Sequence, residues 1–212
     1  MNGLIRNNFY SMESNLKISF ILAAALVFSP LIINNTAIYP MIIAVQIFLF
    51  VVNTGTALHA DEAAKWNKFE LTLPVKRSTI IGAKYIIFAI LILFGLFMGF
   101  CTTICISLSG QTWSVSSTLW GYEYGLVLSI FSVSLMYPVV LKIGTEKNEL
   151  VLILSAFTAI GFMYLVAVAL SPVTSGINLR HPLVGAVSIT VAVLVFIISF
   201  VVSMKIHKNK EF

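Results

Sequence analysis

Long uncharged stretches separate short charged ones along the chain. Charged residues are absent from positions 18–58, 85–122, 124–141, 150–179 and 181–204. A helix needs about 20 residues to cross a hydrocarbon core of about 30 Å, so each stretch can hold at least one crossing. The polar cluster Asn34-Asn35-Thr36, followed by Pro40, divides the first stretch into two. The pattern therefore predicts six membrane-spanning helices, near 18–33, 40–58, 80–108, 121–141, 150–170 and 183–204.

The composition agrees with a membrane protein. Of the 212 residues, 59% are hydrophobic and 10% are charged, and the mean hydropathy is +1.00, whereas soluble domains carry about 25% charged residues. Six crossings use about 120 residues, which leaves too few for a second folded domain. We expect an all-α polytopic membrane protein with a single transmembrane domain over residues 1–212. A soluble ATPase that drives it would have to be a separate polypeptide.

The basic residues are divided unevenly between the two sides of the six predicted helices. Twelve of the 13 Lys and Arg residues fall on the side of the two termini, and Arg180 alone falls on the other side. Cytoplasmic loops of membrane proteins are enriched in Lys and Arg. We therefore expect both termini to be cytoplasmic, with loops 34–39, 109–120 and 171–182 outside. Trp113 and Trp120 then fall at the outer interface, where amphipathic aromatic rings gather.

The predicted spans hold few groups that could perform chemistry. Glu123 is the only acidic residue within one of them, whereas ion-coupled transporters usually need an ionisable residue near the midplane. It can extend toward outer water or contact a cationic substrate. The three His residues lie in loops or tails, so no intramembrane protease motif forms. Cys101 and Cys105 share one helical face and are better explained by packing than by a disulfide or a zinc site. The sequence contains no nucleotide-binding Gly-x4-Gly-Lys-Ser/Thr motif.

Segment 59–79, between the second and third predicted spans, has the most distinctive sequence. Residues 61–71 predict a short amphipathic helix, because acids begin it, good helix formers follow and Pro74 ends it. Trp66 and Phe69 lie on nearly the same face, with Glu62 one turn before Trp66. Such a helix can pass force from a cytoplasmic partner to two spans, or it can simply lie on lipid headgroups. Residues 1–17 predict a second amphipathic helix, which leads into the first span along the membrane surface.

The same segment resembles the signature of type-2 ABC transporter permeases. The resemblance rests on Asp61-Glu62 with Trp66, on Leu71-Thr72-Leu73-Pro74-Val75-Lys76-Arg77 and on Ile80-Ile81-Gly82-Ala83-Lys84-Tyr85. Among these permeases the chain is most similar to membrane subunits of bacterial peptide exporters, such as those for phenol-soluble modulins. The resemblance implies that segment 59–79 is a coupling helix, in which Asp61, Glu62, Trp66 and Phe69 meet a groove of the ATPase. Pro74 and Arg77 would fix the turn back to the membrane, and Lys84 would anchor the third span at the inner headgroups.

The resemblance also implies a complete transporter in a bacterial cell membrane. Two permease chains, identical or related, would form the pathway, and two separate ABC ATPase subunits would hold ATP and magnesium. Neither a cofactor in this chain nor a nucleic-acid partner is expected. A pathway faced by apolar residues favours a hydrophobic or amphipathic substrate, moved outward. Small residues of the fifth span suit either a dimer seam or a contact within one chain: Ser155, Ala156, Ala159 and Gly161. Loop 171–182 is too short for the re-entrant element that many such permeases have there.

Two other classes of function remain open from the sequence. A non-catalytic immunity or sensor protein would bind a toxic peptide directly and would work without an ATPase. A membrane enzyme would keep its activity as an isolated chain and lose it when a single His is changed. The exporter interpretation predicts instead that the chain depends on a separate ATPase subunit.

Overall fold

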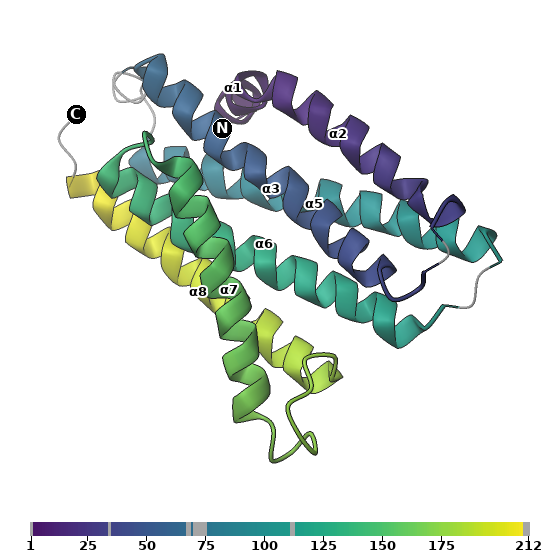
Figure 1. Cartoon of the computed structure of the whole chain (residues 1–212). Coiled ribbons are helices and arrows are strands. Elements are labelled where there is room, and N and C mark those ends of the chain that lie inside the picture. Colours follow the sequence, from purple (N-terminus) through teal and green to yellow (C-terminus); the bar gives the residue numbers. More distant parts are fainter. Residues whose placement is uncertain (1, 34, 67–68, 70–75, 111–112, 210–212) are drawn as a thin grey trace.

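Figure 1 shows the computed structural model of the chain, which describes residues 2–33, 35–66, 69, 76–110 and 113–209. Within these residues every regular element is helical. The elements are α1 (Asn2–Ser11), α2 (Glu13–Val27), the 3-10 turn η1 (Ser29–Leu31), α3 (Tyr39–Ala63), α5 (Arg77–Leu108), α6 (Val115–Ile143), α7 (Asn148–Ala169) and α8 (Pro182–Asn209). The expected all-α architecture is confirmed.

Six segments of the described chain are long and apolar enough to cross a membrane: Glu13–Leu31, Tyr39–Ala63, Arg77–Leu108, Val115–Ile143, Asn148–Ala169 and Pro182–Lys208. The six predicted spans are therefore confirmed in number and order. Several helices are longer than the apolar runs that predicted them, because the backbone stays helical through polar residues that tolerate a helix. α6, for example, begins at Val115 rather than at 121, and the Ser114 side chain caps it by accepting a hydrogen bond from the Ser117 N–H.

α3 is the most buried of these spans and packs against both α5 and α6 (Figure 1). Glycines permit a close approach at both seams. A Cβ atom on Gly95 of α5 would stand 2.5 Å from the Ile47 Cα, and one on Gly121 of α6 would stand 2.5 Å from the Pro40 carbonyl oxygen. Small residues of this kind let spanning helices pack backbone against backbone. α7 and α8 pack on the other side of α6.

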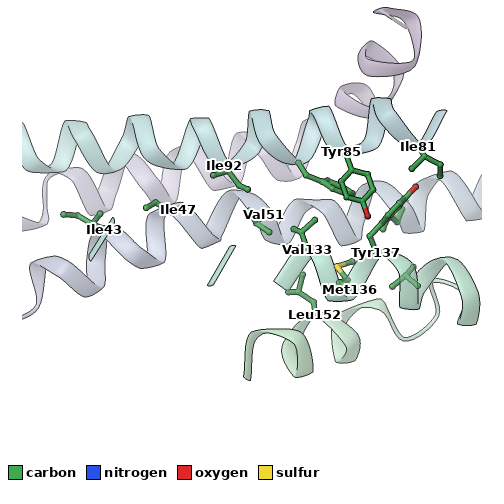
Figure 2. Close-up of a cluster of buried hydrophobic side chains, with 13 residues drawn as sticks. Ile43, Ile47, Val51, Ile81, Tyr85, Ile92, Val133, Met136, Tyr137 and Leu152 are labelled. Atoms are coloured by element: carbon green, nitrogen blue, oxygen red, sulfur yellow. The ribbon is translucent and has the colours of Figure 1, made fainter. Parts of the chain in front are cut away.

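The largest cluster of buried hydrophobic side chains joins α3, α5, α6 and α7 (Figure 2). It extends from Ile43 to Tyr85 and Tyr137, whose rings meet edge to face with centroids 5.4 Å apart. The Tyr85 hydroxyl lies 2.6 Å from Ser199 Oγ and 3.0 Å from Ser203 Oγ on α8. Because lipid offers no hydrogen-bond partner, these contacts both satisfy the hydroxyl and fix α8 to the core.

Buried amide side chains connect α2 to its neighbours. The Gln46 amide of α3 donates to the Ala23 carbonyl oxygen (3.1 Å) and accepts from the Thr102 hydroxyl of α5 (2.8 Å). The Asn53 amide donates to Ser19 Oγ (2.9 Å). A buried amide without partners is costly, so these hydrogen bonds fix the position of α2 against α3 and α5.

α1 corresponds to most of the predicted lead-in helix, but it packs on protein and does not lie on lipid alone. It ends at Ser11, and residues 13–17 of the predicted helix belong to α2. Leu4 contacts Ile80 and Ala83 near the start of α5. Met12, between the two helices, is completely buried. The apolar face of the lead-in segment is therefore largely covered by the bundle.

One end of the bundle, which we call the basic end, gathers most of the positive charge. It contains α1, the end of α3, the start of α5, the α6–α7 loop (residues 144–147) and the end of α8 (Figure 1). The cations described in these parts and next to them are Arg6, Lys17, Lys65, Lys76, Arg77, Lys84, Lys142, Lys147, Lys205 and Lys208. Arg180 lies at the opposite end. The uneven division of charge along the sequence is thus an uneven division between two ends of the molecule.

The structure refines the expectations for Trp120 and for the small residues of α7. Trp120 was expected at an outer interface, but it is only 8% exposed, and the Arg180 guanidinium lies 5.1 Å from its ring centroid. Because α6 begins at Val115, Trp120 is inside the helix and faces the bundle.

On α7, Ser155 and Ala159 are buried within the chain, whereas Gly161 is exposed. The contact within one chain therefore accounts for the first two small residues.

Candidate coupling site at the basic end

α3 continues into the segment that was expected to form a separate helix. Asp61 and Glu62 lie in the last turn of α3, and the chain then turns at Lys65, whose φ is 53°. The prediction that these acids begin a helix over 61–71 is therefore wrong. The reason is that residues 59–63 are tolerated in a helix and contain no breaker, so α3 extends past the apolar run that predicted it.

Trp66 and Phe69 form an aromatic pair just beyond the end of α3. Their ring centroids lie 5.1 Å apart, with 39° between the ring planes. Trp66 is partly buried, and Phe69 is 52% exposed. The two rings thus lie together, as their spacing predicts, and they place apolar surface at the basic end. Pro74 and the rest of 70–75 lie outside the described residues.

Asp61 pairs with Lys84 of α5, across the base of the coupling segment. The Lys84 ammonium donates to the Asp61 carboxylate and to the side-chain oxygen of Asn8 on α1. The exposed fractions of Asp61, Lys84 and Asn8 are 3%, 4% and 1%. We call this three-residue contact the neck. A buried charge is tolerated when it is paired, so the neck holds α1, α3 and α5 together.

The neck changes the expected positions of two residues. The Lys84 side chain points into the protein and does not reach the inner headgroups as expected. Asp61 likewise faces the inside of the bundle. A contact between Asp61 and an ATPase groove stays a prediction, and it would require this ion pair to open.

Glu62 binds the α6–α7 loop. Its Oε2 accepts a hydrogen bond from the Thr145 N–H (2.7 Å). One turn earlier on α3, His59 Nδ1 lies 3.4 Å from the Thr145 hydroxyl, and another turn earlier the Gly55 carbonyl oxygen accepts from the Asn148 side chain (2.7 Å). The three contacts lie on one face of α3. The loop between α6 and α7 is therefore fixed to the helix that leads into the coupling segment.

Arg77 begins α5 and contacts the end of α8. Its Nη1 donates to the carbonyl oxygens of Lys208 (2.7 Å) and His207 (3.1 Å). The last carbonyls of a helix have no partner within the helix, and a cation is favourable there. Besides the expected role at the turn into the membrane, Arg77 thus ties the start of α5 to the end of α8.

Glu123 lies toward the opposite end of the molecule and takes no part in this site. Its carboxylate packs so closely against Gly185 of α8 that a Cβ atom there would overlap it. Among the residues that the structure describes, no Lys, Arg or His nitrogen lies within 4.0 Å of Glu123. The side chain is partly buried and packs against α8.

A comparison with protein families gives a match over almost the whole chain. The model of a family described as ABC-2 family transporter protein matches residues 3–208. The chain belongs to the ABC-2 transporter family. No curated protein and no solved structure shows a significant match to it. As an ABC-2 family member, the chain is a permease subunit of an ABC transporter, and the family implies an ABC ATPase as its partner.

The basic end of this ABC-2 permease brings together most residues that the sequence singled out. Asp61, Glu62, Trp66 and Arg77 lie between the end of α3 and the start of α5, whereas Glu123 lies elsewhere. The sequence did not point to four residues that complete these contacts: Asn8, His59, Thr145 and Asn148. The position of Lys84 could have indicated a buried contact, because it is the only charged residue within the third predicted span. A charged residue at such a position needs either a partner or a path to the interface.

Proposed function

We propose that this ABC-2 permease is the membrane-spanning subunit of an ATP-driven exporter and that the coupling segment, residues 59–79, docks the ATPase. The neck carries the proposal: the buried pair of Asp61 and Lys84 closes the base of this segment, and the Trp66–Phe69 pair lies just beyond it. Aromatic side chains that fill a partner's pocket are the usual anchors of protein interfaces. ATP and magnesium would be held by the ATPase subunit.

The contacts of the basic end offer a route from such a docking site to most of the spans. A displacement of Trp66 would move the end of α3, and the Asp61–Lys84 pair would pass it to α5. Glu62 would pass it to the α6–α7 loop, and Arg77 would pass it to α8. Packed helices move between discrete arrangements and do not bend continuously. Closure of two ATPases would therefore shift these helices together and alternate access to the pathway.

The basic end would face the cytoplasm, with both termini on that side. The excess of Lys and Arg at this end supports the assignment, because cytoplasmic loops carry such an excess. The same orientation would place the coupling segment where a soluble ATPase can reach it.

An apolar groove supports a hydrophobic or amphipathic substrate. The groove has a volume of about 360 Å³ and is lined by apolar side chains of α5, α6 and α8, among them Leu93, Leu126, Ile130 and Phe196. Glu123 lies one turn from Leu126 on the same face of α6. It would contact a cationic group of a substrate whose apolar part occupies the groove. A peptide or a lipid-like molecule fits this description, and a second permease chain, identical or related, would complete the pathway.

The test is to purify the chain together with the products of its neighbouring genes and to measure ATP hydrolysis and export in proteoliposomes. An ABC ATPase should co-purify. Changing Trp66→Ala with Phe69→Ala removes the docking rings, and we expect export to fall by about tenfold or more, as for other interface anchors. Ile143→Ala is the matched control, because it removes an apolar side chain that is 66% exposed at the same end.

The outcomes separate the possible functions. Export that survives loss of both rings at the control level contradicts the docking assignment. Full activity after removal of every ATPase favours an immunity or sensor protein over an exporter.

A further inference from the structure

A pocket lies in the corner where α1 meets α2, at the basic end. The chain bends at Met12, the N-cap residue of α2, and Figure 1 shows α1 turned away from the direction of α2. The pocket has a volume of about 290 Å³. Its lining includes the apolar side chains of Phe9, Leu16 and Phe20, which we call the floor, and the charged side chains of Arg6, Glu13 and Lys17, which we call the rim. Its lining therefore combines apolar rings with basic groups.

The floor of the pocket is held by the bundle. Phe20 packs edge to face on Phe50 of α3 and Phe94 of α5, with ring centroids 4.8 Å and 5.5 Å apart. Phe9 also lies beside Phe94, at 6.4 Å between centroids. Leu16 is 8% exposed. The apolar floor is thus a fixed surface that can receive a hydrocarbon chain.

Arg6 is oriented by the side chain one turn away from it. Its Nε and Nη2 atoms donate to the Tyr10 hydroxyl at 3.1 Å and 2.8 Å, and its guanidinium carbon lies 5.3 Å from the Tyr10 ring centroid. A guanidinium has five N–H donors, so most of them are left for another acceptor. Phosphate oxygens suit these donors in both charge and geometry.

The other charges at the rim leave a positive balance. The Lys17 ammonium lies 2.7 Å from a Glu13 carboxylate oxygen, and the two side chains are 70% and 53% exposed. Such an exposed pair contributes little energy, so Lys17 can turn toward another anion. With Arg6, the rim has two positive groups and one negative group. The balance favours an anionic ligand.

We propose that this pocket binds one anionic phospholipid of the leaflet at the basic end. The phosphate would lie at Arg6 and Lys17, and an acyl chain would lie along the floor formed by Phe9, Leu16 and Phe20. The first spanning segment begins at Glu13. Arg6 therefore lies before the span, and Lys17 lies one turn into it, from where its long side chain can reach the headgroups. Phe20 lies a turn deeper, at the depth of the acyl chains. The positive rim selects an anionic headgroup, because basic groups near a membrane surface attract anionic lipids.

A bound lipid would also restrain the helix that completes the neck. Arg6 and Phe9 lie on α1 on either side of Asn8, which contacts Lys84. Fixing α1 would therefore fix one of the three members of the neck. This effect on transport rests on the proposed function, whereas lipid binding itself does not.

Native mass spectrometry of the purified full chain tests the binding directly. The chain is titrated with phosphatidylglycerol or with phosphatidylcholine that has the same acyl chains. We expect phosphatidylglycerol to bind about tenfold more tightly, given the usual attraction of two basic groups to an anionic lipid, and Arg6→Gln with Lys17→Gln to abolish the preference. Lys142→Gln with Lys205→Gln is the matched control, because it removes the same charge from exposed positions at the same end and should keep the preference.

Glycerol phosphate, which has the anionic group without acyl chains, separates a lipid site from a simple anion site. It should bind far more weakly than phosphatidylglycerol. Equal binding of the two lipids, an undiminished preference in the Arg6 and Lys17 variant, or tight binding of glycerol phosphate would each overturn the proposal. Because the readout is binding to the isolated chain, these results are independent of whether the exporter assignment holds.

Discussion

Lys84 shows how a single charge can organise a membrane protein. A lysine near the end of a span usually extends its ammonium to the headgroups. Here the side chain points inward, because the Asp61 carboxylate and the Asn8 side chain supply acceptors inside the bundle. A buried pair adds little stability compared with apolar residues of the same size, but loss of one partner strands the other charge.

Substitution of Lys84 tests the neck. We expect Lys84→Met to lower the free energy of unfolding by about 3–5 kcal/mol, because Asp61 is then buried without a partner. Asp61→Leu added to Lys84→Met should recover much of the loss, since no charge is left unpaired. Melting temperatures in detergent measure both effects, and Lys76→Met, at an exposed position, is the control. A Lys84→Met variant as stable as the control would show that the neck is open in solution.

The sequence could show that Lys84 needs either a partner or a path to the interface, but it could not show which of the two applies or which residue is the partner. Asp61 is separated from Lys84 by most of the coupling segment, and Asn8 lies in another helix. Only the packing of α1 and α3 on α5 selects these two residues from the polar residues near the ends of the spans. The family resemblance pointed to the segment before α5 and assigned Lys84 to the headgroups, because snorkelling is the usual behaviour of such a residue.

The apolar pattern of the sequence predicted the number of membrane-spanning helices better than it predicted their ends or their packing. The pattern located all six spans, because hydrocarbon solvation requires the long apolar runs. It placed the end of α3 and the start of α6 too far toward the membrane centre, because a helix ends where the backbone stops being helical and not where hydropathy falls. It also gave no measure of how closely α3 approaches α5 and α6, which depends on single glycines.

Those glycines carry a prediction about helix packing. Gly95→Ala and Gly121→Ala each place a Cβ atom against the α3 backbone, so we expect each to lower the free energy of unfolding by about 1–3 kcal/mol, as overpacking does elsewhere. Gly161→Ala is the control, because no atom from another part of the described chain lies within 4 Å of its Cβ position. Thermal unfolding in detergent compares the three variants. Equal stability of all three would contradict the close seams on α3.

Positive charge is divided unevenly between the two ends of the molecule, and the sequence already predicted this division. Of the Lys and Arg residues that the structure describes, all but Arg180 lie at or near the basic end. The same division along the sequence holds even if each predicted helix boundary is wrong by several residues. The inward contacts of the same end were not visible, because they join positions that are far apart in the chain. The count of charged residues therefore predicted which segments share an end of the molecule. The contacts of the candidate site depend on the packing of the helices and could not be predicted in this way.

Labelling of single cysteines tests which end of the molecule faces the cytoplasm. In a background with Cys101→Ala and Cys105→Ala, cysteine is introduced at Ile177 of the opposite end or at Lys142 of the basic end, both of which are exposed. A membrane-impermeant maleimide applied to intact cells should label the Ile177→Cys variant and leave Lys142→Cys unlabelled until the cells are broken. The reverse pattern would overturn the cytoplasmic assignment of the basic end.

The neck also constrains the order of biosynthesis. Asn8 and Asp61 leave the ribosome before Lys84 exists, so their final partner is missing while the first two spans enter the bilayer. Both side chains must then stay hydrated at the membrane surface until α5 is inserted and packs beside α3. A nascent chain that stops short of residue 84 lacks the ammonium that pairs with Asp61 and Asn8, so the contact that holds α1, α3 and α5 together cannot form in it.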